Sequence, residues 1–268
     1  PEAFPRRQAV CYLPEQLTDD LRETFDRVYV PLWYFGTGNF PASADPRATA
    51  GSGGRRDPLP WIPDGVLLPP VIPDTEREDV LHRLLEAKRA GVTYALTGNV
   101  GHLAVVREAG LVPVGDFRLN ICNASSLAVE RSLGFHGMIL SPELTLPRLA
   151  DLSSGDTAAI VYGRLPLMVL EKCVGTEIGG CRICTENRLM LTDRIGAEFP
   201  VLRLPPHRSL IFNSVPTWMA DRTEVLARYR VERLVFLFTT ETAVETDRVI
   251  AAYRNGSAPT SAIRRIGK

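Results

Sequence analysis

Three cysteines and a histidine late in the chain have the types and spacing of a metal site. Cys181 and Cys184 are separated by two residues, Cys173 precedes this pair, and His207 follows it. Thiolate and imidazole ligands suit zinc or an iron–sulfur cluster and exclude magnesium or calcium. We therefore expect a soft-metal site held by Cys173, Cys181 and Cys184, with His207 as the candidate fourth ligand. The alternatives are buried thiols without a metal, and a hydrogen bond inside the same segment for His207.

Polar side chains also follow several short apolar runs that we interpret as β-strands. In a (β/α)8 barrel, residues at the carboxyl ends of the strands face the reaction site. Carboxylates and phenols can transfer protons, and arginine binds carboxylates or phosphates. The candidate catalytic residues are Asp116, Glu143 and Tyr162, and the candidate substrate-binding residues are Arg118, Asn120, Asn123 and Arg164.

Each of these candidates has a structural alternative. Asn123 directly precedes a predicted helix, where asparagine commonly caps the free N–H groups. Arg118 and Arg164 could equally belong to internal salt-bridge networks. Asp116 and Glu143 end neighbouring predicted strands, so they could reach one ligand. The sequence contains no nucleophile elbow and no glycine-rich phosphate loop.

The elements that must position these residues alternate between strands and helices, which predicts parallel βα units. Eight such strands predict a single (β/α)8 TIM-like barrel over residues 1–268, with a metal-binding, cysteine-containing insertion at 163–231 between strands seven and eight. The predicted strands are Gln8–Leu13, Arg27–Leu32, Gly65–Pro69, Thr93–Thr97, Val112–Asp116, Gly137–Ser141, Ala158–Tyr162 and Arg233–Phe238. The predicted helices are Asp74–Ala90, Val100–Ala109, Ala124–Leu133, Thr145–Leu149 and Glu241–Asn255.

The first of these helices has the strongest boundary signals. Asp74 is placed to cap its amino end, and Gly91 follows its last turn. Apolar residues recur at helical spacing from Val80 to Leu85, and the stripe extends to Lys88. We expect this face to pack on the sheet.

Composition narrows the class of protein. The chain has 268 residues, 45% of them hydrophobic, and equal numbers of basic and acidic residues, 31 of each. A net charge of zero gives no overall field to attract nucleic acid, although a local patch could still do so. No apolar run reaches the roughly 20 residues that span a bilayer. Five cysteines, three of them clustered, favour a reducing compartment over a disulfide framework. We expect a cytoplasmic protein with no membrane partner.

Several motifs together resemble the collagenase-like peptidase family (peptidase U-thirty-two). They follow the family's order and spacing over most of Thr93–Arg222. The central motif runs from Tyr162 to Met168 (YGRLPLM) and continues from Glu171 to Cys173 (EKC). The flanking matches are Gly115–Asn120 with Asn123, Leu140–Leu144, Asp193–Gly196, Phe199–Val201, His207–Arg208 and Asn213–Ser214.

This resemblance implies a barrel with a cysteine-ligated site in its late insertion. Relatives of the family include iron–sulfur proteins that hydroxylate a tRNA uridine, an rRNA cytidine or a ubiquinone precursor without oxygen. Several of them use prephenate as the hydroxyl donor. The family's fourth cysteine falls at His207 here, which leaves iron–sulfur and Cys3His zinc both open. The start of the chain, which lacks methionine, resembles the second barrel of long two-barrel members, so a missing N-terminal domain of the same protein is an expected partner.

Three functions follow from these patterns. The first is an iron–sulfur-dependent hydroxylase, with RNA as its substrate and a small anionic, prephenate-like donor. The second is a metal-dependent collagenase-like peptidase, for which the residues supply no activated nucleophile. The third is a non-catalytic barrel with structural zinc, which would dock a catalytic N-terminal barrel.

Overall fold

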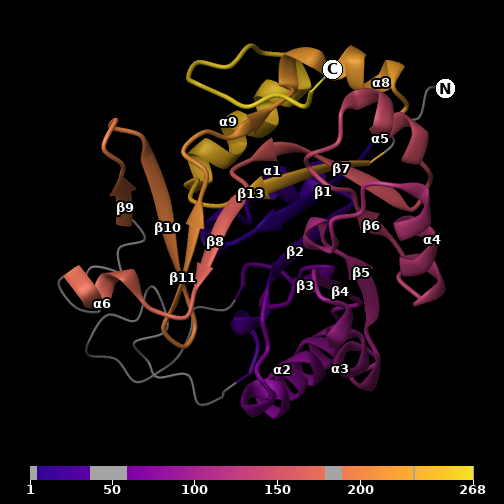
Figure 1. The fold of residues 1–268 in the computed structure, drawn as a ribbon, viewed down its shortest axis with the longest axis vertical. Helices are drawn as coiled ribbons and strands as arrows, with labels where there is room; N and C mark the ends of the chain where they lie inside the picture. Colours follow the sequence, from indigo (N-terminus) through magenta and orange to yellow (C-terminus); the bar gives the residue numbers. More distant parts are fainter. Residues whose placement is uncertain (1–4, 37–58, 179–188, 232, 268) are drawn as a thin grey trace. The chain divides into compact units, whose positions relative to one another are not determined.

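A computed structural model describes residues 5–36, 59–178, 189–231 and 233–267 (Figure 1). The chain divides into two compact units. Of the described residues, the first unit comprises 5–36, 60–163, 217–231 and 233–267, and the second comprises 59, 164–178 and 189–216.

The first unit is a closed barrel. Within the described residues, eight parallel strands form a ring, because β7 pairs with β6 on one side and β13 on the other. This confirms the predicted (β/α)8 fold, and every predicted strand is present. The strands are β1 (Arg6–Cys11), β2 (Arg27–Pro31), β3 (Gly65–Leu67), β4 (Tyr94–Thr97), β5 (Val112–Gly115), β6 (Met138–Ile139), β7 (Thr157–Gly163) and β13 (Arg233–Phe238). A short strand, β12 (Thr217–Trp218), adds to β7 in antiparallel orientation.

These runs form barrel strands because both of their faces are covered. All seven residues of β7 are buried, and so are five of the six residues of β13. Parallel strands that are buried on both faces have continuous apolar sequences rather than alternating ones. This is the pattern that identified them in the sequence.

Helices connect the strands. They are α1 (Asp19–Thr24), α2 (Arg77–Ala90), α3 (Leu103–Glu108), α4 (Ala124–Ser132), α5 (Leu146–Leu152), α8 (Thr223–Arg228) and α9 (Ala243–Asn255). The sequence predicted five of these but not α1 or α8, each of which is only six residues long. Thr18 starts α1 by accepting a hydrogen bond from the N–H of Leu21.

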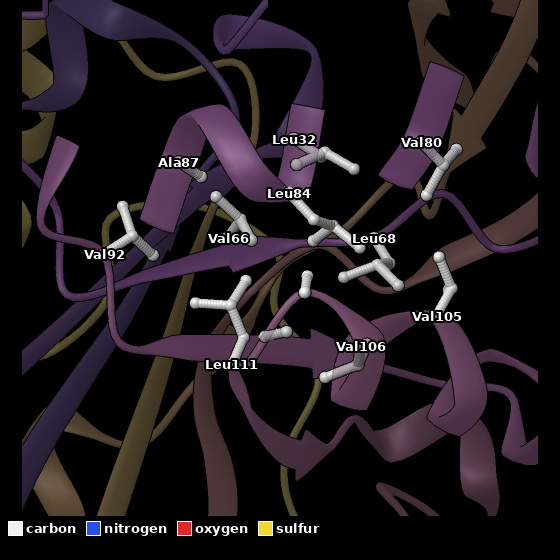
Figure 2. Close-up of a cluster of buried hydrophobic side chains, with 12 residues drawn as sticks. Leu32, Val66, Leu68, Val80, Leu84, Ala87, Val92, Val105, Val106 and Leu111 are labelled. Atoms are coloured by element: carbon white, nitrogen blue, oxygen red, sulfur yellow. The ribbon is translucent and has the colours of Figure 1, made fainter. Parts of the chain in front are cut away.

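The packing of α2 on the sheet shows how the outer face of the barrel is covered (Figure 2). Leu84 and Ala87 of α2 are fully buried, and they join one cluster with Val66 of β3 and Leu68, which follows that strand. Lys88 is exposed, so the buried stripe follows Ala87 and not Lys88 as predicted.

The two ends of α2 differ in how well the sequence predicted them. Gly91 adopts the left-handed conformation at the carboxyl end, with φ of 107°, as expected for a helix-terminating glycine. At the amino end the prediction was wrong. Asp74 belongs to a 3-10 turn, η4 (Asp74–Glu76), and the α-helix begins only at Arg77, without a side-chain cap.

The second unit contains a four-stranded antiparallel sheet in the order β8-β11-β10-β9. It interrupts the barrel between β7 and β13, where the cysteine-containing insertion was predicted. The unit ends at Pro216, before the predicted boundary near Val231, because β12 and α8 belong to the barrel unit. Its elements are β8 (Pro166–Leu170), α6 (Val174–Ile178), β9 (Leu189–Thr192), β10 (Glu198–Leu204) and β11 (Arg208–Phe212).

None of the helices that the structure describes has the length and apolar character needed to cross a bilayer.

Candidate functional site

Asp116 and Arg118 form a buried ion pair where β5 ends. Asp116 follows the last residue of β5 and is 1% exposed. Its Oδ1 accepts the N–H of Phe117 at 2.9 Å, and its Oδ2 accepts a hydrogen bond from Arg118 Nη1. A guanidinium held in this way is preorganised, and its remaining N–H groups could pair with a carboxylate.

The protonation of this pair is set by burial and by mutual attraction. Burial raises the pKa of Asp116, while the Arg118 guanidinium acts in the opposite direction. Burial alone would lower the pKa of Arg118, but the Asp116 carboxylate and the Tyr12 hydroxyl raise it overall. Arg118 therefore stays a cation at every pH at which the protein is folded.

Two neighbours position the Arg118 side chain. Gly98 directly follows β4, and a Cβ atom at this position would lie 2.4 Å from Arg118 Cβ. The absence of a side chain at Gly98 therefore lets Arg118 cross the end of β4. On another side, Arg118 Nη2 lies 3.5 Å from the hydroxyl of Tyr12, whose pKa burial raises. Sequence reasoning missed both residues: Gly98 directly follows the predicted strand Thr93–Thr97, whereas Tyr12 was placed inside the predicted strand Gln8–Leu13, which in the structure ends at Cys11.

Asn120 and Glu143 lie at the neighbouring strand ends but do not complete a common site with Asp116. Asn120 adopts a left-handed conformation with φ of 51°, and its Oδ1 accepts a hydrogen bond from Ser141 Oγ at 2.7 Å. Glu143 is exposed. Within the described part of the chain, no hydrogen bond or ion pair links Glu143 to Asp116, which is bound to Arg118 instead.

Asn123 is a helix cap. Its Oδ1 accepts the N–H of Ser126 at 2.8 Å at the start of α4. This is the structural alternative that the sequence offered for Asn123. Its amide nitrogen lies 3.8 Å from Cys122 Sγ on an exposed part of the chain, so one donor remains at the surface.

Tyr162 is paired with a carboxylate that sequence reasoning did not propose. The Tyr162 hydroxyl donates a hydrogen bond to Glu241 Oε1 at 2.8 Å. Glu241 Oε2 accepts the N–H groups of Thr239 and of Thr240, the latter at 3.0 Å. Glu241 follows β13, so the strand-end rule that selected the other candidates would have found it. The sequence instead predicts a helix from Glu241, whereas α9 begins at Ala243, after Glu241.

The surroundings of this pair are apolar. The Tyr162 ring lies 5.4 Å from the ring of Phe238 and 5.9 Å from that of Trp218. Cys11, at the end of β1, is fully buried; burial raises the pKa of its thiol, and the negative charge of Glu241 adds to this effect. Cys11 is therefore a neutral thiol rather than a nucleophile.

Arg164, a predicted substrate-binding residue, belongs to the second unit. Its Nη1 donates hydrogen bonds to the main-chain carbonyls of Asn213, at 3.0 Å, and of Ser214. These bonds join the start and the end of the inserted segment. These contacts give Arg164 a structural role within the inserted segment.

The described members of the predicted metal site lie at one end of the inserted sheet. β8 and β11 are antiparallel, with Leu170 opposite Ser209. Cys173 comes shortly after Leu170, and His207 comes shortly before Ser209, so the chain brings both to the same end. Cys173 is 3% exposed, and the next residue, Val174, donates its N–H to Ser209 Oγ at 3.0 Å.

His207 lies exposed in the turn between β10 and β11. Cys181 and Cys184 lie outside the described residues. Among the residues that are described, no three histidine, cysteine, aspartate or glutamate side chains gather as a metal site. A buried thiol and an imidazole at one sheet end fit soft-metal ligation by their chemistry, and the predicted cysteine pair would supply the remaining ligands.

Comparisons with known proteins give structural likenesses alone. No protein-family model matches the chain, and no curated protein matches it. Among solved structures, the chain is similar to the U32 peptidase Mk0906, with a TM-score of 0.44, 12% identity, and coverage of 90% of this chain and 96% of the other. This neighbour bears the name of the family that the sequence motifs resemble.

Two further solved structures show similar values. For the spore cortex-lytic enzyme SleL of Bacillus megaterium, the TM-score is 0.38 and the identity 8%, with coverage of 100% and 77%. For a chitinase from Chromobacterium violaceum, the TM-score is 0.39 and the identity 10%, with coverage of 94% and 98%. The barrel itself is established by the strand pairing of this chain.

Proposed function

We propose that this chain is an iron–sulfur-dependent, oxygen-independent hydroxylase that modifies a pyrimidine of tRNA or rRNA with a prephenate-like hydroxyl donor. The observation that carries the proposal is the placement of Cys173. It is buried at the sheet end that also carries His207, within the insertion that contains Cys181 and Cys184. These four residues would hold the cluster. When bound, an iron–sulfur cluster supplies electron transfer.

Arg118 is the best-supported residue for binding an anionic donor. The Asp116 carboxylate fixes the guanidinium, and Gly98 leaves the space in which it lies. Arg118 Nη1 is occupied by Asp116, so a carboxylate of the donor would bind to the other N–H groups. In this role Asp116 orients Arg118 rather than transferring a proton.

Tyr162 and Glu241 are the best-supported residues for proton transfer. Their hydrogen bond of 2.8 Å is short enough for a proton to move from the phenol oxygen to the carboxylate. The surrounding aromatic rings limit access by water. The exposed Glu143 and the amides of Asn120 and Asn123 would then contact the outer parts of the substrate.

The test is spectroscopic and chemical. Protein purified without oxygen should absorb broadly in the visible range and contain iron and acid-labile sulfide. Cys173→Ser should lose both, whereas Cys122→Ser, which changes an exposed thiol outside the ligand set, should keep them. A deletion strain should lack one hydroxylated nucleoside, and the wild-type gene should restore it while the Cys173→Ser gene should not. Normal hydroxylation in the Cys173→Ser strain would contradict the proposal.

A second function has its own supporting observation. The polar side chains of the barrel mouth are largely satisfied by one another, since Asp116 binds Arg118 and Tyr162 binds Glu241. Such pairing suits a non-catalytic barrel with structural zinc, which would dock a catalytic N-terminal domain of the same protein. Colourless protein with one bound zinc, and an unchanged nucleoside profile in the deletion strain, would favour this alternative. The peptidase alternative has no supporting observation among the described residues.

A further inference from the structure

Three arginines lie at the amino-terminal ends of three neighbouring barrel strands, all within the first unit. Arg6 is the first residue of β1, Arg27 of β2 and Arg233 of β13. In the sheet, β1 lies between β13 and β2. Arg6 and Arg233 are direct register partners. Arg27 is the register partner of Gln8, two residues further along β1. The three side chains therefore point to one face from adjacent positions.

That face is the inside of the barrel. On β13, Phe236 points outward, because its ring centre lies 4.6 Å from that of Tyr253 on α9. Successive residues of a strand point to opposite faces, so Arg233 points inward, and Arg6 and Arg27 share its face by register. Arg6 is exposed, and the other two are half-buried. These three arginines, here called the arginine cluster, line the amino-terminal opening of the barrel.

The contacts of the arginine cluster leave its charges in place. None of its members forms an ion pair with an acidic side chain among the residues that the structure describes. Arg27 Nη1 donates to the hydroxyl of Tyr29 at 3.3 Å, and Arg233 Nε donates to the carbonyl of Gly155 at 2.7 Å. Burial raises the pKa of Tyr29 to about 12, so it stays a neutral phenol. Both acceptors are therefore uncharged.

The two carboxylates nearest to the arginine cluster are engaged elsewhere. Asp64 Oδ2 accepts the N–H of Val28 at 2.8 Å. Asp156 accepts hydrogen bonds from Arg131 at 2.6 Å and 2.8 Å, so the charge of Arg131 already balances it. The amino-terminal opening of the barrel thus keeps a surplus of positive charge.

The members of the arginine cluster repel one another. Like charges directly opposite one another on neighbouring strands are unfavourable, and Arg6 and Arg233 have this relationship. Burial, and then the charges of Arg6 and Arg27, lower the pKa of Arg233. The Arg27 guanidinium also lies 3.7 Å from the centre of the Tyr94 ring, a contact that orients the cation without neutralising it. An anion at this opening would relieve the repulsion.

We propose that the arginine cluster binds a phosphate group at the amino-terminal opening of the barrel. Guanidinium groups present paired N–H donors that match the oxygens of phosphate. A phosphate group also offers several acceptor oxygens to several cations at once. This site lies at the opposite end of the strands from Arg118, so it goes beyond the proposed hydroxylase and does not depend on it. Inorganic phosphate and the phosphodiester groups of RNA share this chemistry, and the experiment separates them.

The experiment measures binding by calorimetric titration of the full chain with inorganic phosphate and, separately, with a short single-stranded RNA. Sodium chloride keeps the ionic strength constant in the phosphate series. Arg6→Gln and Arg233→Gln are compared with wild type and with the matched control Arg7→Gln. The control removes one positive charge from the neighbouring residue of β1, which points to the other face. The melting temperature is measured in chloride alone and in phosphate.

Wild type should bind the phosphate group, and Arg6→Gln and Arg233→Gln should each weaken binding by about 10-fold or more. Arg7→Gln should bind as wild type does. In chloride alone, Arg6→Gln should melt at or above the wild-type temperature, because the substitution removes a repulsion with Arg233. Binding of inorganic phosphate but not RNA would identify a free phosphate as the ligand. Binding of RNA, with a salt dependence that falls by about one ion in Arg6→Gln, would identify the RNA backbone.

Three results would overturn the proposal. Wild type that binds neither inorganic phosphate nor RNA has no such site. Equal affinity in Arg6→Gln, Arg233→Gln and Arg7→Gln would place the phosphate elsewhere. A melting temperature of Arg6→Gln that lies equally far below wild type in chloride and in phosphate would make the cluster a structural part of the barrel. Because Arg6 is exposed, its substitution leaves the comparison intact even if Arg233→Gln does not fold.

Discussion

The hydroxyl of Tyr162 joins the carboxyl ends of two neighbouring barrel strands by donating a hydrogen bond to Glu241. Tyr162 lies on β7, Glu241 follows β13, and the two strands pair directly. The second oxygen of Glu241 accepts two main-chain N–H groups that also follow β13. The Glu241 carboxylate therefore links the carboxyl ends of β7 and β13.

Tyr162→Phe should lower the free energy of unfolding by about 1.5–3 kcal/mol, because it removes a hydrogen bond to a charged group. Urea denaturation of Tyr162→Phe, Glu241→Gln and the double variant would measure the coupling between the two side chains. If the pair transfers a proton, Tyr162→Phe should also lower hydroxylation far more than the lost stability explains. Strictly additive effects of the two substitutions would show that the bond does not form.

Gly98 should not tolerate a side chain, because Arg118 occupies the space that a Cβ would need. We expect Gly98→Ala to lower the free energy of unfolding by about 1–3 kcal/mol, the usual cost of overpacking. It should also weaken binding of a dicarboxylate donor such as prephenate, since Arg118 must move. Calorimetric titration of the donor would measure this loss.

Gly155→Ala is the matched control. Gly155 is exposed, and a Cβ added there would meet no atom within 4 Å. Its effect on stability should stay within about 0.5 kcal/mol, and donor binding should not change. Equal donor affinity in Gly98→Ala and Gly155→Ala would remove Arg118 from the proposed donor site.

Asn123 can be tested for capping and for binding separately. Asn123→Ala removes the acceptor for the N–H of Ser126 and should cost about 1 kcal/mol of unfolding free energy. Asn123→Asp keeps the acceptor and should preserve stability, but it replaces the amide donor by a negative charge. Full stability with reduced hydroxylation in Asn123→Asp would assign the amide to substrate binding. Unchanged activity in that variant would leave Asn123 as a cap.

The barrel could be predicted because its strands carry a strong local signal. Strands such as β7 and β13 are apolar throughout, and the polar residues that follow them mark where they end. The inserted sheet lacks this signal. β8 exposes Leu167 and Met168, and β11 begins with Arg208, which pairs with Glu171 in the fold. Nothing within either strand alone predicts this pairing.

The candidate site was predictable in its residues but not in their partners. The strand-end rule selected Asp116, Arg118 and Tyr162, and it would also have selected Glu241. It could not show that Asp116 binds Arg118, because a carboxylate and a guanidinium at these positions could equally face a ligand.

His102 should make the protein less stable in mild acid. It lies 6% exposed after β4, with its Nδ1 3.1 Å from Thr97 Oγ1, and burial lowers its pKa from 6.5 to about 4. Above pH 6.5 the ring is neutral in both the folded and the unfolded chain, so its contribution to stability is complete. Between pH 6.5 and about 4 only the unfolded chain gains a proton there, so the free energy of unfolding falls as the pH is lowered.

The total loss from His102 over this pH range should be about 2–3 kcal/mol. Urea denaturation at a series of pH values would measure it in wild type and in His102→Gln, whose side chain does not titrate. His102→Gln should show a flatter dependence on pH, while His136→Gln, which changes an exposed ring, should follow wild type. A wild-type slope in His102→Gln would mean that another group causes the loss. A flat profile in wild type itself would show that the buried ring gains its proton without cost to the fold.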